Sequence, residues 1–148
     1  MGHTRKPFDQ MEIGTTHVEM RTITEEDVNT FGRLSGDLNP LHMDEAFATK
    51  TIFQRRVVHG MFTAAIISTA HTNLTDPGYV YVGQELNFKA PVFIGDTITV
   101  TLTVVEKKPK KKILVLEAVV TNQDEKVIVE GRSALMELDD LYTRRTNS

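Results

Sequence analysis

The chain has 148 residues, 40% of them hydrophobic and 25% charged, and its formal net charge is −3. These values fit one soluble globular domain, and the negative charge argues against a nucleic-acid-binding protein. The sequence contains no cysteine, which excludes disulfides, thiolate metal sites and cysteine nucleophiles. Its first residues show no apolar run after their positive charges, so we expect no secretory signal. No apolar stretch approaches the ~18–20 residues that a membrane span needs. We therefore expect no membrane association and a cytoplasmic location.

The first part of the chain predicts an extension, a strand and a helix. Residues 1–14 are mostly polar and are expected to be loosely ordered. His17 to Ile23 alternates in part and favours a short strand. Thr24 is a candidate N-cap, because three acidic residues follow it in what would be the first helical turn. An apolar stripe then predicts the buried face of this helix, which Gly36 ends. The stripe consists of Val28, Phe31 and Leu34.

The segment after this helix holds two proton-handling side chains, Asp37 and His42. Pro40 fixes its own φ and disfavours a helical Asn39, so we expect an extended segment past Asp37. An acid and an imidazole five positions apart on a braced loop can both reach one small molecule, as an acid/base pair must. The alternative is a turn aspartate and a structural histidine in an ordinary helix-to-loop connection. Asn39 is likewise either a turn residue or an amide that orients Asp37 or a water molecule.

Two more helices are predicted before the chain becomes all strand. Asp44 can cap a short helix that runs through Lys50. Residues from Gly60 to about Thr72 are apolar almost all the way round, which predicts a buried helix roughly 20 Å long. A backbone N–H at the start of that helix, at Gly60, could stabilise negative charge on an oxygen. The alternative is a glycine that merely packs against a strand. A turn is expected at 73–78.

The remainder predicts an antiparallel meander, and with the helices it gives a single α+β domain over residues 15–138. Gly131 inside the last strand suggests a bulge or a close backbone approach. Residues 139–148 are predicted to be a frayed polar tail. The predicted strands are Tyr79–Ala90, Thr97–Glu106, Ile113–Thr121 and Lys126–Leu138.

The loop residues resemble the signature of the (R)-specific enoyl-CoA hydratases, the MaoC-like branch of the hot-dog superfamily. The resemblance extends to the segments 58–61, 83–88 and 90–96, and so to roughly residues 15–138. The signature positions are matched without departure by Phe31, Leu34, Ser35, Gly36, Asp37, Asn39, Pro40, Leu41, His42 and Ala48.

This resemblance implies a hot-dog fold, in which a curved antiparallel sheet wraps around the long central helix, and a homodimer with active sites near the subunit interface. It implies reversible hydration of trans-2-enoyl-CoA to (R)-3-hydroxyacyl-CoA without a cofactor. Asp37 and His42 would share the catalytic water, and the Gly60 amide would polarise the thioester carbonyl. Ser68 matches the hydroxyl that the family uses to hold the catalytic acid, although a lone serine in a helix often bonds a backbone carbonyl instead. His59 is either a capping or core residue or a direct participant.

The densest charge cluster is a basic turn at 107–112. Such runs are commonly solvated hairpin tips, but Lys107, Lys108 and Lys110 could contact coenzyme A phosphates or an acidic carrier protein. A metal site from His42, Asp44 and His59 has no support in their spacing, and we expect no metal.

Two rival functions use the same fold. A thioesterase would hydrolyse acyl-CoA, and a non-catalytic acyl-binding or assembly subunit would bind without turnover. The presence of both Asp37 and His42 favours the hydratase. The preferred chain length, and the choice between coenzyme A and acyl carrier protein, are not readable from the residues.

Overall fold

The computed structural model describes residues 6–75 and 78–138. Within them, no helix is both long enough and apolar enough to cross a membrane. In chain order the elements are the 3-10 helix η1 (Phe8–Gln10), strand β1 (Thr16–Thr22), helices α1 (Glu25–Ser35), α2 (Pro40–Met43), α3 (Glu45–Thr49) and α4 (Gly60–Thr75), and strands β2 (Tyr79–Phe88), β3 (Thr97–Lys108), β4 (Ile113–Thr121) and β5 (Val127–Glu137).

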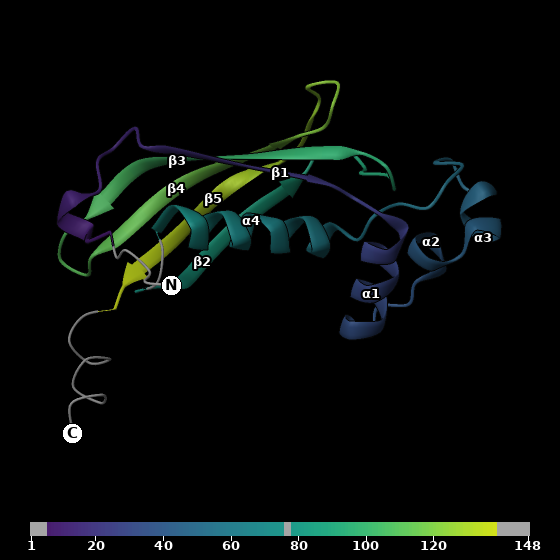
Figure 1. Cartoon of the computed structure of the whole chain (residues 1–148), viewed down its shortest axis with the longest axis horizontal. Coiled ribbons are helices and arrows are strands. Elements are labelled where there is room, and N and C mark those ends of the chain that lie inside the picture. The colour runs from purple at the N-terminus through teal and green to yellow at the C-terminus, as the bar shows by residue number, and fades with distance from the viewer. Residues whose placement is uncertain (1–5, 76–77, 139–148) are drawn as a thin grey trace.

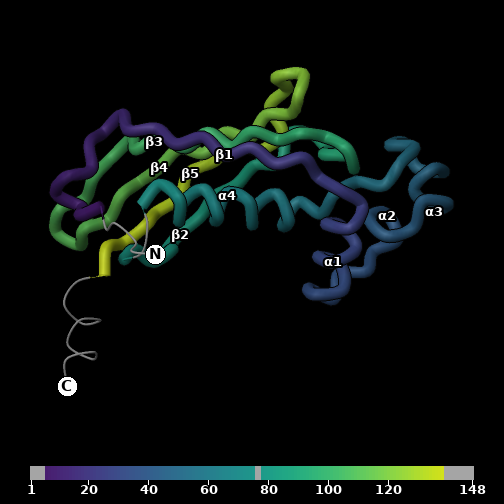
Figure 2. The backbone as a smooth tube through the Cα atoms, viewed as in Figure 1, coloured from purple at the N-terminus to yellow at the C-terminus, as the bar shows by residue number. Residues whose placement is uncertain are grey.

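The strands form one antiparallel sheet in the order β1-β3-β4-β5-β2. The sheet is curved, and α4 runs along one of its faces (Figure 1). The three shorter helices gather beyond the end of the sheet where α4 begins (Figure 2). The expected α+β arrangement, a curved antiparallel sheet with a long helix against it, is therefore confirmed.

The core lies between the sheet and α4. Alternate residues of β3 are fully buried, as expected for a strand with one face on the core, and those of β4 behave in the same way. On α4, Ile67 and Ala70 are buried against them. The fully buried side chains of β3 are Ile98, Val100, Leu102 and Val104.

The prediction that α4 is buried all round is wrong for this single chain. Only one side of the helix lies on the sheet, and Met61 on the other side is 64% exposed. Ala65 is exposed as well. An apolar helix face without a covering layer is therefore present next to the sheet.

The prediction of a loosely ordered N-terminus is also wrong for residues 6–14. Phe8 and Met11 are 3% and 6% exposed and belong to the hydrophobic core. Gly14 donates to the carbonyl oxygen of Val104 at 2.8 Å, which ties the segment to β3. Burial of two large apolar side chains outweighs the polar character of their neighbours. The predicted tail at 139–148 and the centre of the predicted turn, 76–77, lie outside the described residues.

Gly131 marks a close approach between strands rather than a bulge. A Cβ atom there would collide with the carbonyl oxygen of Glu85 on β2. Gly131 pairs in register with Leu86 on β2 and Ala118 on β4, and the register shifts of the sheet lie elsewhere.

On α1, Leu34 departs from the predicted buried stripe, because its side chain is 85% exposed.

A buried histidine lies between the second half of α4 and the sheet. The His71 ring is 2% exposed, its Nε2 lies 2.7 Å from Ser133 Oγ, and it packs edge-on to Tyr81. Burial lowers the pKa of His71 to about 4 and raises the pKa of Tyr81 to about 12. His71 is therefore neutral in the folded protein at neutral pH.

We expect the titration of His71 to make the free energy of unfolding depend on pH. Between pH 6.5 and 4 the unfolded chain binds a proton at this residue and the folded chain does not, so stability falls as the pH drops through this window. From pH 7 to pH 5 the loss from this residue is about 2 kcal/mol. Urea unfolding at pH 7 and at pH 5 measures this loss in the free energy of unfolding. His71→Gln, which can still bond Ser133 but does not titrate, should lose correspondingly less, and equal losses in both proteins would contradict the assignment.

Candidate active site

The loop that carries Asp37 is fixed by local hydrogen bonds. Helix α1 begins with a capping box at Thr24 and ends at Gly36, whose φ of 82° lies in the left-handed region that glycine tolerates. The Ser35 hydroxyl then accepts a bond from the Asp37 amide at 3.2 Å, and Asp37 Oδ1 accepts one from the Asn39 amide at 3.3 Å. The predicted turn role of Asp37 is therefore present, but it occupies only one of the two carboxylate oxygens.

The extended segment expected past Asp37 is short: Asn39 has a non-helical ψ of 125°, and Pro40 then begins the one-turn helix α2. Proline suits the first helical position, where its fixed φ is already helical and its missing N–H is not needed. Asn39 caps this helix, with its Oδ1 accepting from the Leu41 amide at 3.0 Å. The helix turns His42 back toward Asp37.

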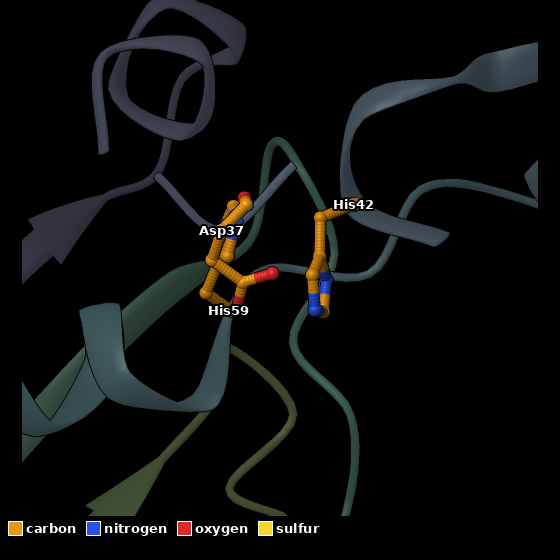
Figure 3. A group of neighbouring side chains, drawn as sticks. All are labelled: Asp37, His42 and His59. Carbon is orange, nitrogen blue, oxygen red and sulfur yellow. The ribbon is translucent and has the colours of Figure 1, made fainter. Parts of the chain in front are cut away.

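Asp37, His42 and His59 come together, with ligand atoms that all lie within 4.8 Å of one another. Figure 3 shows the Asp37 carboxylate directed toward the His42 ring, with His59 beside them. A water molecule that makes two hydrogen bonds of about 2.8 Å at a near-tetrahedral angle joins atoms about 4.6 Å apart. The carboxylate and the imidazole, no more than 4.8 Å apart, are therefore within the reach of one shared water molecule.

The hydrogen bond of His42 assigns its tautomer. Its Nδ1 lies 2.7 Å from the carbonyl oxygen of Val57, and a carbonyl can only accept, so Nδ1 carries the proton and donates. The Nε2 lone pair is then available as an acceptor or base. His42 is half-buried and Asp37 is exposed, so the pair lies at the protein surface.

His59 supports both members of the pair. It is 2% exposed, its Nε2–H donates to the carbonyl oxygen of Asp37 at 2.9 Å, and its ring stacks on that of His42 with 4.1 Å between centroids. Phe31 packs edge-on against it, with centroids 5.0 Å apart. These contacts place His59 behind the pair, as a residue that positions the Asp37 backbone and the His42 ring.

The geometry of the three residues does not suit a metal ion. The two imidazole planes are inclined by only 30° and face each other, so their in-plane lone pairs run side by side instead of converging on one point. His59 Nε2 is engaged with Asp37. Asp44, the other carboxylate considered from the sequence, accepts from the Phe47 amide at 3.2 Å as the cap of α3.

A groove of about 420 Å³ adjoins His42 and the first residue of α4, Gly60. Among the described residues the Gly60 amide has no acceptor, whereas the amides of Phe62 and Thr63 bond the His59 carbonyl. A Cβ at Gly60 would lie 2.8 Å from Cε1 of Phe88, so glycine keeps the groove open at this point. The groove is lined by Leu41, His42, Phe53, Val57, Val58, Gly60, Thr63, Phe88, Lys89, Ala90, Pro91, Val92, Ile128 and Val129.

Ser68 and the basic turn are not brought to this site within one chain. Ser68 lies eight residues after Gly60, about 12 Å along the helix axis, and lines a separate small pocket with His71. Lys107, Lys108 and Lys110 lie at or just after the end of β3 remote from α1–α3 (Figure 1). Lys107 donates to the carbonyl oxygen of Met11 at 2.7 Å.

Several residues of the site carried no recognisable signal in the sequence. Arg56 is 5% exposed and bonds the carbonyl oxygen of His42 at 2.6 Å, yet nothing distinguishes it from its neighbour Arg55 in the sequence. Val57 contributes only its backbone carbonyl. Phe88, the last residue of β2, and Lys89, the residue after it, both line the groove. Only the fold brings these groups together.

The chain matches the MaoC like domain over residues 10–126. It is 42% identical over 130 residues to the (R)-specific enoyl-CoA hydratase of Rhodospirillum rubrum, covering 87% of this chain and 90% of that protein. It is 39% identical over 127 residues to the 3-hydroxybutyryl-CoA dehydratase of Methylorubrum extorquens, covering 85% of this chain and 80% of that protein.

Two solved structures of hydratases are also similar to this chain. The R-hydratase PhaJ1 from Pseudomonas aeruginosa superposes with a TM-score of 0.84 at 38% identity, covering 89% of this chain and 85% of that one. The (R)-hydratase from Aeromonas caviae, described as involved in PHA biosynthesis, superposes with a TM-score of 0.83 at 35% identity. The match covers 86% of this chain and 97% of that one.

Proposed function

This chain belongs to the MaoC-like domain family of hydro-lyases, and we propose that it adds water to trans-2-enoyl-CoA to form (R)-3-hydroxyacyl-CoA and catalyses the reverse elimination. The observation that carries the proposal is the placing of Asp37 within 4.8 Å of His42, which itself lines a groove together with Gly60. The groove volume of about 420 Å³ falls in the range of small-molecule sites.

The proposed mechanism uses one water molecule held between the pair. Both the Asp37 carboxylate and His42 Nε2 accept hydrogen bonds, so they would take the two hydrogens of the water and direct an oxygen lone pair at C3 of the substrate. The oxygen bonds to C3, one proton passes to the pair, and the π electrons move to the thioester oxygen. The pair then returns a proton to C2 on the same face, which restores the carbonyl.

The Gly60 amide is proposed to stabilise the enolate oxygen. It is the first amide of a 16-residue helix, so the hydrogen bond and the helix dipole act together on the developing charge. The thioester is itself the substrate, and the reaction as written needs no added cofactor. His59 and Asn39 would act by positioning, because their contacts run to Asp37 and to the backbone of the loop.

Turnover of a series of trans-2-enoyl-CoA thioesters, with chiral analysis of the product, tests this function. We expect loss of the enoyl absorbance and an (R)-3-hydroxyacyl product. Asp37→Asn and His42→Ala should each lower kcat by about 10²–10⁴-fold, because they remove proton transfer. KM of Asp37→Asn should change little, since Asp37 does not line the groove. A thiol reagent with saturated acyl-CoA should detect no release of coenzyme A. Thiol release would favour a thioesterase, and binding without turnover would favour a non-catalytic subunit.

Gly60→Pro tests the amide separately from the space around it. Proline is tolerated at the first position of a helix but has no N–H to donate. Gly60→Ala is the matched control, since it adds a Cβ beside Phe88 but keeps the amide. We expect kcat of the proline variant to fall about 10²–10³-fold below that of the alanine variant. Equal kcat values in two folded variants would rule out the proposed donor.

We also propose that two copies pair through β2. This strand is an edge of the sheet, and its side chains Val80 and Val82 are exposed. The face of α4 that carries Met61 is also uncovered. Edge-to-edge pairing would satisfy the outer backbone groups of β2 and cover that helix face.

Sedimentation equilibrium should give twice the 16.7 kDa mass of one chain. Val82→Asp should shift the protein toward monomer, because a two-fold axis brings like charges together at the β2 edge. Ile52→Asp, at a residue that is 91% exposed after α3, is the control and should remain dimeric. A monomeric wild-type protein at micromolar concentration would contradict the pairing.

A further inference from the structure

Arg56 is a buried cation that lies behind the site and contacts two elements at once. Its Nε donates to the carbonyl oxygen of His42 at 2.6 Å, and its Nη2 donates to Asn29 Oδ1 at 2.6 Å. Its Nη1 also reaches Glu25 Oε1 at 3.1 Å. The side chain of Arg56 is 6% exposed and that of Glu25 is 70% exposed, so the ion pair is solvated and the bonds to Asn29 and His42 matter most.

These two partners belong to the elements that deliver the two reacting side chains. Asn29 lies on α1, whose end leads through Gly36 directly into Asp37. The His42 carbonyl lies on α2, which presents the imidazole. We propose that Arg56 is a positioning residue that sets the separation between the Asp37 carboxylate and the His42 imidazole by fastening α1 to α2. This inference rests on the proposed function.

The chemistry of the side chain fits this role. A guanidinium presents planar N–H donors in a rigid fork, so one side chain can hold two acceptors in a fixed relation. A lysine offers a single point charge on a flexible stem and can satisfy one of the two acceptors well, but not both in that relation. The α1–α2 connection is surface loop, and residues 33–40 are all exposed, so hydrogen bonds, including the one from His59 to the Asp37 carbonyl, fix its geometry more than apolar packing does.

The test compares steady-state kinetics of Arg56→Lys and Arg56→Met with the wild-type enzyme on a short enoyl-CoA. We expect kcat to fall roughly 10- to 100-fold in the methionine variant, because a small misplacement of a reacting group costs this much. The lysine variant should recover part of that loss. KM should stay within about twofold of wild type, since Arg56 does not line the groove.

Arg21→Met is the matched control. Arg21, on β1, also binds α1, with its Nη2 donating to Asp27 Oδ1 at 2.8 Å. Within the described residues no hydrogen bond or ion pair joins it to α2. It should keep kcat near wild type even where the melting temperature falls. A loss of kcat in Arg21→Met that equals the loss in Arg56→Met at equal stability would reduce Arg56 to a structural residue and overturn the proposal.

Asn29→Ala provides a second route that keeps the buried cation in place. It removes the link to α1 but leaves the bond from Arg56 to the His42 carbonyl. We expect a several-fold fall in kcat, and no further fall when it is combined with Arg56→Met, because both remove the same connection. Additive losses, or wild-type kcat in folded Asn29→Ala and Arg56→Lys, would overturn the proposal.

These experiments distinguish a failure of the role proposed for Arg56 from a failure of the proposed function. If Asp37→Asn and His42→Ala keep wild-type turnover, the acid/base assignment fails and Arg56 has no pair to position. If those two variants lose activity while the Arg56 and Asn29 variants keep theirs, the function stands and only the role of Arg56 is refuted.

Discussion

The site depends on the hydrogen bonding between two short segments, residues 37–42 and the residues that lead into α4. The Val57 amide donates to the Leu41 carbonyl at 3.2 Å, and the Val57 carbonyl accepts from His42 Nδ1 at 2.7 Å. Two residues later, His59 donates to the Asp37 carbonyl at 2.9 Å. The next residue begins α4. A single stretch of backbone therefore orients the imidazole, holds the carboxylate and presents the first helix amide, so the relative positions of the three groups are set together.

That stretch is in turn fixed to the core. The amide of Val58 donates to the carbonyl of Val92 at 2.8 Å, and Val57 forms an isolated bridge with Phe93. Val58 and Val92 are both buried. Rigid support matters because proton transfer requires heavy-atom distances within a few tenths of an ångström of the productive value. The connection between β2 and β3, which contains the buried Val92, supplies this rigidity, although the loop that carries Asp37 lies on the surface.

Local patterns predicted much of the fold, whereas tertiary contacts decided what they missed. The alternation of β3 and the string from Asp37 to His42 are properties of neighbouring residues, and both led to correct placements. Arg55 and Arg56 are identical neighbours with opposite environments: the guanidinium of Arg55 lies 3.7 Å from the ring centroid of Phe93 on the outside, and Arg56 is buried. No local rule separates them, because burial depends on where α1 lies. The same holds for Phe8, whose partners come from distant strands.

The two interpretations of Asp37, as a turn residue and as a catalytic acid or base, are not exclusive. Its Oδ1 accepts from the Asn39 amide, and Asn39 Oδ1 in turn accepts from the Leu41 amide. These short-range bonds stiffen an exposed loop that has no apolar packing of its own. They occupy one carboxylate oxygen and leave the second oxygen without a hydrogen bond from the loop. In the proposed mechanism that second oxygen binds the water beside His42, and the turn would meet the cost of ordering the loop before substrate arrives.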